Sequence, residues 1–156
     1  MKHYYNNVKT NRGITLIELV VVISIISILF ICSFKGLLIA KENIDLNRAA
    51  HQLEATIQSC HSKAFYSGIY YKIEFQPMFD RYRIFRGTDL KRVVNLDNIN
   101  LHYTNFTDYK VRLLPNGCPS MGGTVTLKNK SGKTLYVITT PVTARTRISD
   151  KPPENW

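Results

Sequence analysis

The 156-residue chain is poor in acidic residues and in cysteine. Only 11 Asp and Glu stand against 21 Lys and Arg, so the formal net charge is +10, which favours anionic partners. Three cysteines exclude a disulfide-dense scaffold and leave at least one thiol unpaired. A chain that is 44% apolar and 21% charged is not disordered, and its length suits one domain with a core of ordinary size.

The motifs that mark common catalytic and metal sites are also missing. The sequence has no P-loop, no Gly-x-Ser-x-Gly, no His-Glu-x-x-His and no paired-cysteine motif. His51 and His61 are ten residues apart, which is not a metal-ligand spacing. We therefore predict a protein that is not an enzyme and has no cofactor and no metal. An anchored envelope enzyme would need a pocket that these motifs do not show.

The longest apolar run extends from Ile14 to Phe34 and contains a single charge, Glu18. About 20 apolar residues suffice for a helix to cross a bilayer. Lys2, Lys9 and Arg12 precede the run with no acidic residue among them, and positive charge keeps that end of a chain in the cytoplasm. We predict a single-pass protein of the cytoplasmic membrane, with its N-terminus in the cytoplasm and the rest of the chain outside.

Two ordinary interpretations of this run leave Glu18 unexplained. A signal peptide would be cut after the run, but the region around Leu38–Ala40 is a poor cleavage site. A lipoprotein site at Cys32 is weaker still, because bulky Ile31 precedes it. A plain anchor helix is the second interpretation. Neither accounts for a carboxylate that costs about 2.5–3.5 kcal/mol inside an apolar helix.

The segment Gly13-Ile14-Thr15-Leu16-Ile17-Glu18 resembles the type IV pilin signature. The resemblance implies that a prepilin peptidase cleaves between Gly13 and Ile14 and then methylates the new amine of Ile14. It also implies that Glu18 faces the Ile14 amine of a neighbouring subunit in a fibre, which would replace two unpaired buried charges by an ion pair. Residues 1–13 would be the leader, and their removal lowers the formal charge from +10 to +7.

An amphipathic pattern follows the apolar run. Six apolar residues recur every three or four positions and form one stripe: Leu46, Ala50, Leu53, Ile57, Cys60 and Ala64. No proline occurs between Ile14 and Gln76, so we predict a single helix from Ile14 to about Phe65. Residues 14–38 would be its transmembrane and fibre-core half, and residues 39–66 its amphipathic half.

From Ile69 onward the apolar pattern has a period of two, which predicts strands. The predicted strands are 70–75, 81–85, 98–105, 110–114, 124–128, 134–140 and 143–148. The chain is therefore α+β, with a long N-terminal helix packed on an antiparallel sheet over residues 69–148. A proline-containing tail, residues 149–156, completes a soluble domain of residues 39–156.

The C-terminal half resembles the GspH/FimT branch of minor pseudopilins. The resemblance rests on Gly123–Leu127, on the hairpin at Gly132-Lys133, on Thr134–Thr140 and on Ala144-Arg145-Thr146-Arg147, where Ala144 replaces the usual glycine. It implies a minor pilin or pseudopilin of a type IV pilus, a type II secretion system or a competence pseudopilus, priming assembly near the tip of an extracytoplasmic fibre. The implied partners are other pilin subunits, prepilin peptidase and an inner-membrane assembly platform.

Basic residues suggest an alternative function. Arg81 and Arg83 are two apart in a predicted strand, as are Arg145 and Arg147, so each pair shares a face. In FimT-type minor pilins the C-terminal Arg-x-Arg region is implicated in DNA uptake. The resemblance therefore implies a DNA-binding minor pilin that uses Arg145, Arg147 and Lys151, with the cluster around Arg81 and Arg83 in support. The competing interpretation is a solvated strand whose charges protect a sheet edge.

The cysteines allow one further prediction. Cys60 lies on the helix stripe and Cys118 in a turn-rich loop, and outside the cytoplasm they could form a disulfide. The loop that it would close is long enough for a stabilisation of about 4 kcal/mol. The alternative is two separate buried thiols. Cys32, in the apolar run, would be inert packing.

Overall fold

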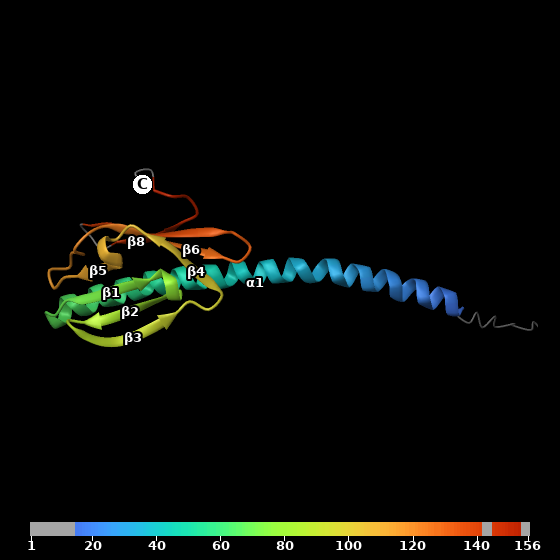
Figure 1. The fold of residues 1–156 in the computed structure, drawn as a ribbon, viewed down its shortest axis with the longest axis horizontal. Helices are drawn as coiled ribbons and strands as arrows, with labels where there is room; N and C mark the ends of the chain where they lie inside the picture. Colours follow the sequence, from blue (N-terminus) through green and yellow to red (C-terminus); the bar gives the residue numbers. More distant parts are fainter. Residues whose placement is uncertain (1–14, 142–144, 154–156) are drawn as a thin grey trace, which may run out of the picture. The chain divides into compact units, whose positions relative to one another are not determined.

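The computed structural model describes residues 15–141 and 145–153, without the side chains of Cys32 and Ser33. Within these residues, helix α1 (Leu16–Ser67) comes first and eight strands follow it in the order of Figure 1. The chain divides into two compact units, the first ending at Leu38 and the second beginning at Ile39. Helix α1 contributes to both units.

In the first unit, the large apolar side chains of α1 from Leu16 to Leu38 are all exposed where the structure describes them. This part of the helix is long and apolar enough to cross a membrane. Its two described hydroxyl groups bond within the helix: Ser24 Oγ donates to Val20 O, and Ser27 Oγ to Ile23 O, both at 2.7 Å. An apolar environment would therefore leave neither hydroxyl unsatisfied.

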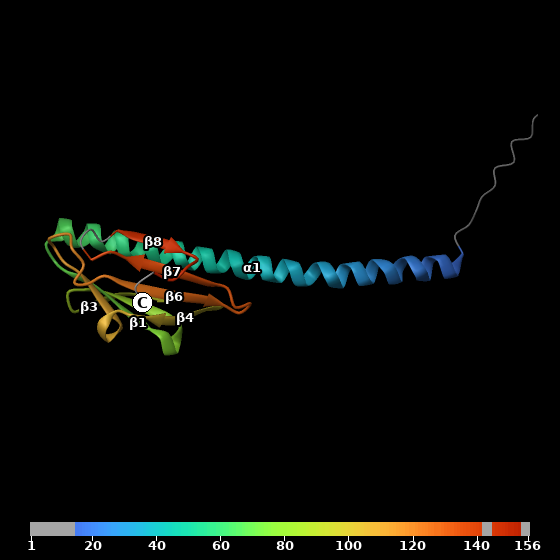
Figure 2. The same cartoon turned by 90° about the horizontal axis from the view of Figure 1, so that it is seen from above.

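The second unit contains two four-stranded sheets in which all paired strands are antiparallel. The first has the order β3-β2-β1-β5 and consists of β1 (Tyr71–Gln76), β2 (Arg81–Arg86), β3 (Asp89–Asn95) and β5 (Lys110–Leu113). The second has the order β4-β6-β7-β8 and consists of β4 (Ile99–Thr104), β6 (Gly123–Asn129), β7 (Thr134–Thr139) and β8 (Thr146–Ser149). Figure 2 shows this second sheet with its strands in that order.

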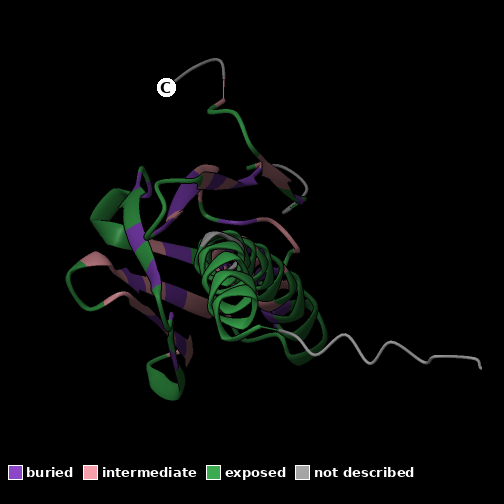
Figure 3. Cartoon of the chain, turned by 90° about the vertical axis from the view of Figure 1, so that its right-hand side faces the viewer, coloured by how far each residue is buried: buried purple, intermediate pink, exposed green. Residues whose placement is uncertain are grey.

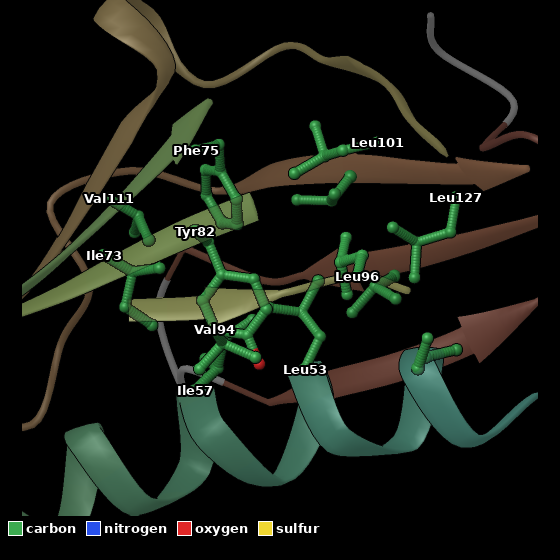
Figure 4. Packing of buried hydrophobic residues seen from close by; sticks show 14 of the residues in the cluster. Leu53, Ile57, Ile73, Phe75, Tyr82, Val94, Leu96, Leu101, Val111 and Leu127 are labelled. Atoms are coloured by element: carbon green, nitrogen blue, oxygen red, sulfur yellow. The ribbon is translucent and has the colours of Figure 1, made fainter. Parts of the chain in front are cut away.

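The amphipathic stripe of α1 supplies one wall of the core, as the spacing predicts. Its six residues, Leu46 to Ala64, are at most 4% exposed. Figure 4 shows Leu53 and Ile57 pointing from the helix toward Tyr82 and Val94 of the first sheet. Buried residues alternate with less buried ones along β1 and β2 (Figure 3), so the first sheet turns one face to the core. In the second sheet, β6 is instead buried at four successive residues, Thr124 to Leu127.

The structure confirms the α+β class and the helix-on-sheet arrangement, with two differences. The sequence predicts one sheet, whereas the structure has two. The sequence pattern also predicts no strand at 89–95, where the structure has β3. The first five residues of β3 are exposed, and a register shift between Ile84 and Phe85 interrupts its pairing with β2, so no period-two apolar pattern marks it. The start of the predicted strand 143–148 lies outside the described residues, and β8 begins at Thr146.

Candidate functional site

The first candidate site is the N-terminal end of α1, where Thr15 caps the helix. The backbone N–H of Glu18 donates to Thr15 Oγ1 at 3.3 Å, and that of Leu19 donates to Thr15 O at 3.1 Å. Thr15 and Glu18 thus have the spacing of a capping box, in which a hydroxyl binds the third backbone N–H of the helix. Gly13 and Ile14, the residues of the predicted cleavage, lie outside the described residues.

Glu18 is an isolated negative charge on an apolar surface. It is exposed, and so are its neighbours Leu16, Ile17 and Leu19. None of the ion pairs among the described residues involves it. The first turn of a helix favours an anion through the helix dipole, which stabilises the carboxylate there.

The second candidate site is β8, the edge strand of the second sheet. Arg145 and Arg147 are exposed on either side of Thr146, which is buried, so both side chains lie on the outer face of the strand. Thr140 holds the start of this segment, donating from its backbone N–H to Arg145 O at 3.0 Å and from Oγ1 at 3.2 Å. Lys151 is exposed just beyond, after a turn closed by Ser149 Oγ.

Arg81 and Arg83 lie on the outer face of β2, but neighbouring side chains engage both. Arg83 Nη2 donates to Glu74 Oε1 at 2.6 Å, and Arg81 Nε donates to Gln76 Oε1 at 2.7 Å. The guanidinium of Arg81 also lies 4.7 Å from the centre of the Phe79 ring. The hydrogen bond from Arg83 is the main reason that the pKa of Glu74 is lowered. This pair is thus less able to bind an external anion than its exposure suggests.

The rest of that basic cluster lies elsewhere. Arg86, Lys91 and Arg92 line a groove of about 590 Å³ between α1 and the first sheet. A fourth cation, Lys63 of α1, joins them there. Lys63 is absent from the site residues that the sequence predicts. It lies more than twenty residues before Arg86 and Arg92, and no sequence pattern connects a helix residue to strand residues at that distance.

The two thiols of the second unit are not joined. Cys60 is a free thiol, 4% exposed, so the predicted Cys60–Cys118 disulfide is not present. Burial raises the pKa of Cys60 to about 11, although nearby Lys63 acts in the opposite direction. Cys118 is half-buried in a loop that His61 fixes to the helix through Nε2 and Gly117 O, 2.6 Å apart. Within the described residues no group of three or more His, Cys, Asp or Glu could hold a metal ion.

A capped apolar helix with one exposed carboxylate, continued by an α+β unit of two antiparallel sheets, defines a pilin-like architecture. Residues 8–31 match the prokaryotic N-terminal methylation motif. The structure is similar to that of the minor pseudopilin EpsH from the type 2 secretion system of Vibrio cholerae, with a TM-score of 0.57 and 11% sequence identity over 67% of this chain and 96% of that one. No curated protein matches by sequence.

The two findings bear on different parts of the chain. The motif covers the start of the apolar run, including Gly13, Ile14 and Glu18, and the structural likeness shows the fold. Together they support the resemblance to a type IV pilin-like minor pseudopilin that the sequence indicates.

Proposed function

We propose that this chain is a minor pilin or pseudopilin, a structural subunit of a type IV pilus, a type II secretion system or a competence pseudopilus. The observation that carries the proposal is the N-terminal methylation motif placed in register with Glu18, the one carboxylate in the exposed apolar part of α1 from Leu16 to Leu38. Its action is assembly rather than catalysis. It resides in the cytoplasmic membrane as a single-pass precursor and passes into an extracytoplasmic fibre.

The chemistry of assembly follows from the start of α1. Prepilin peptidase cleaves between Gly13 and Ile14, which frees a cationic amine on the residue directly before the Thr15 cap. Glu18 then pairs with the methylated amine of a neighbouring subunit. An unpaired carboxylate at membrane depth costs about 2.5–3.5 kcal/mol, so pairing favours the register in which both charges are satisfied.

Processing and assembly can be tested on the full-length chain, co-expressed with a prepilin peptidase and the partner pilins. Intact-protein mass spectrometry should show loss of residues 1–13 and gain of one N-methyl group, and Gly13→Asp should prevent both. Glu18→Gln should be processed but enter sheared fibres poorly, whereas Ser24→Ala, a polar change in the same helix, should enter normally. A chain that stays uncut beside an active peptidase would refute the proposal.

We further propose that the subunit primes assembly near the fibre tip. The sequence resemblance of residues 123–147 to the GspH/FimT branch of minor pseudopilins, which implies priming, supports this placement. Deletion of the gene should then reduce the number of fibres per cell more than their length, and the inner-membrane assembly platform should co-purify with the precursor. A subunit spread evenly along the shaft, seen by immunogold labelling, would contradict it.

The outer face of β8 favours DNA binding as a second candidate function. Arg145 and Arg147 present two guanidinium groups on the same side of an edge strand, with Lys151 beyond them. Arg145→Ala/Arg147→Ala should weaken binding of duplex DNA by the full-length chain in neutral detergent, and the loss should be greatest at low salt. Equal binding by wild type and variant would leave edge protection as the role of these residues.

A further inference from the structure

The groove that Arg86, Lys91, Arg92 and Lys63 line, termed the basic groove, belongs wholly to the second unit. It lies between the C-terminal part of α1 and strands β1 to β3. Its lining is cationic and hydroxyl-rich, with no carboxylate: Gln52, Ala55, Thr56, Ser59, Cys60, Lys63, Tyr71, Ile84, Arg86, Lys91 and Arg92.

Strand geometry explains why cations face this groove. Tyr82 and Ile84 are buried on the helix side of β2, and Arg86 follows on the same side by alternation. Arg92 of β3 pairs in register with Ile84, so its side chain also lies on the helix side. The register shift leaves Lys91 between the partners of Ile84 and Phe85. On a strand in the middle of the sheet, the positions of Arg86, Lys91 and Arg92 would be covered by neighbouring elements and would carry apolar residues. Because β3 is the edge strand of the first sheet, these positions carry charged residues instead.

The positive charge in the groove is not balanced by the chain itself. Among the described residues, no ion pair includes Lys63, Arg86 or Arg92. Lys91 approaches Asp89 at 3.9 Å between Nζ and Oδ2, and that Asp89 side chain is 75% exposed, which makes a weak pair. The outer face of the same sheet differs, because there Glu74 neutralises Arg83.

Aromatic surface continues the groove. A second hollow shares Ser59, Lys63, Tyr71 and Arg86 with the first and extends it to Tyr66, which is 85% exposed. Tyr66 and Phe65 form a T-shaped pair with ring centres 5.7 Å apart, and the high exposure of Tyr66 leaves much of its ring surface open to solvent. The helix residues along both hollows, 52 to 67, span about 22 Å at 1.5 Å per residue, a length that several phosphates of one strand can follow.

We propose that the basic groove binds single-stranded DNA, with its four cations on the phosphates and Tyr66 stacked on a base. Cations along a groove with an exposed ring beside them are the elements of sequence-tolerant single-strand binding. An acidic peptide would use the charges but not the ring. A duplex keeps its bases paired and stacked on one another, so it would not offer a base face to Tyr66. The site is separate from Arg145 and Arg147, and it does not depend on the proposed assembly function.

Salt dependence gives the sharpest test. Full-length protein in neutral detergent would be titrated into fluorescein-labelled oligothymidylate, with anisotropy recorded across a salt series. Four phosphate contacts predict a slope of log K against log salt of about −2.8, since each contributes about −0.7 on single strands. Arg86→Ala/Arg92→Ala should reduce the slope by about 1.4. Arg112→Ala/Lys133→Ala removes the same charge from exposed residues outside the groove and should leave the slope unchanged.

Two further arms separate the ligand classes. Tyr66→Ala should weaken oligothymidylate binding by about fivefold or more through lost stacking, yet leave binding of inorganic polyphosphate unchanged. Arg86→Gln/Arg92→Gln keeps much of the side-chain stem and should reproduce the alanine result, which guards against a folding defect in the first variant.

Several results would overturn the proposal. The first is a wild-type salt slope in both Arg86/Arg92 variants, and the second is an equal reduction of the slope in the Arg112/Lys133 control. The third is binding of poly-glutamate as tight as that of oligothymidylate, and the fourth is loss of all binding only in Arg145→Ala/Arg147→Ala. The last result would place the contact on β8 instead. None of these outcomes bears on cleavage after Gly13, so the assembly proposal is judged separately.

Discussion

Gly123, the first residue of β6, occupies a position with no room for a side chain. A Cβ added there would lie 2.5 Å from Cε1, 2.6 Å from Cδ1 and 2.8 Å from Cζ of Phe106. Phe106 is 3% exposed, and its ring stacks on Phe75 with ring centres 5.6 Å apart and planes inclined by 12°. The ring therefore cannot retreat without disturbing a second buried aromatic residue.

The magnitude follows from these distances. Carbon atoms in contact lie about 3.5–4.0 Å apart, so Gly123→Ala requires the ring or the strand to move by about 1 Å. Overpacking of this kind typically costs about 1–3 kcal/mol, and we expect the upper end because both rings are buried. In a domain of this size, each kcal/mol of lost stability lowers the melting temperature by roughly 4 °C. A loss of about 3 kcal/mol should therefore lower the melting temperature by about 12 °C.

Thermal unfolding of full-length protein in neutral detergent, followed by near-ultraviolet circular dichroism, measures this change. Gly36→Ala is the matched control, because an added Cβ at Gly36 has no atom within 4 Å, and it should leave the transition of the sheet domain unchanged. Phe106→Leu should recover part of the loss when combined with Gly123→Ala, as expected for residues in contact. A Gly123→Ala protein within about 0.5 kcal/mol of wild type would refute the steric argument.

Two predictions concern titratable groups. The pKa of Glu74 is lowered from its usual 4.5, chiefly by the hydrogen bond from Arg83. Its contribution to stability is therefore present above pH 4.5 and disappears as the pH falls through the lower folded-state pKa. Glu74→Gln should lower the free energy of unfolding at pH 7, by about 1 kcal/mol or less for this partly exposed pair, and the difference should shrink on acidification; a difference that grows toward low pH in thermal melts would contradict this. Cys60, with a pKa of about 11, should resist iodoacetamide at pH 8 until urea unfolds the domain. Mass spectrometry of a Cys32→Ser/Cys118→Ser protein measures this, and rapid labelling in native buffer would count against the burial of Cys60.

Local periodicity made much of this fold predictable. The stripe from Leu46 to Ala64 follows from three- and four-residue spacing, and the alternation of β1 and β2 follows from period two, because both patterns are properties of a single element. The division into two sheets could not be predicted in this way. It depends on which strands pair, and β4 pairs with β6 rather than with the first sheet.

Strand β3 shows what happens when an element lacks such a pattern. An edge strand buries little, so its sequence need not alternate, and Leu90 to Val93 are all exposed. The register shift opposite Ile84 further disrupts the period. A basic, irregular segment of this kind has the same composition as a loop, and only pairing with β2 distinguishes it.

The candidate sites also differ in whether a pattern within one element of the sequence reveals them. The signature around Glu18 is contiguous, so the sequence alone indicates it. The basic groove is assembled from α1, β2 and β3, and the contribution of Lys63 depends on the packing of the helix against the sheet. No spacing rule within one element could have joined these residues.

Cross-strand pairing also decides which basic residues are available to a ligand. Arg83 lies opposite Glu74 in the register of β1 and β2, and Arg81 lies opposite Gln76, so each guanidinium group has a hydrogen-bond partner on the outer face of the sheet. Arg86 is on the other face of the same strand, where no carboxylate lines the groove. Substituting Arg83 therefore changes sheet stability together with surface charge, and a loss of binding in that variant would be ambiguous. Arg86 and Arg92 can be replaced without breaking an ion pair that the described residues form, which is why they distinguish a binding role from a structural one.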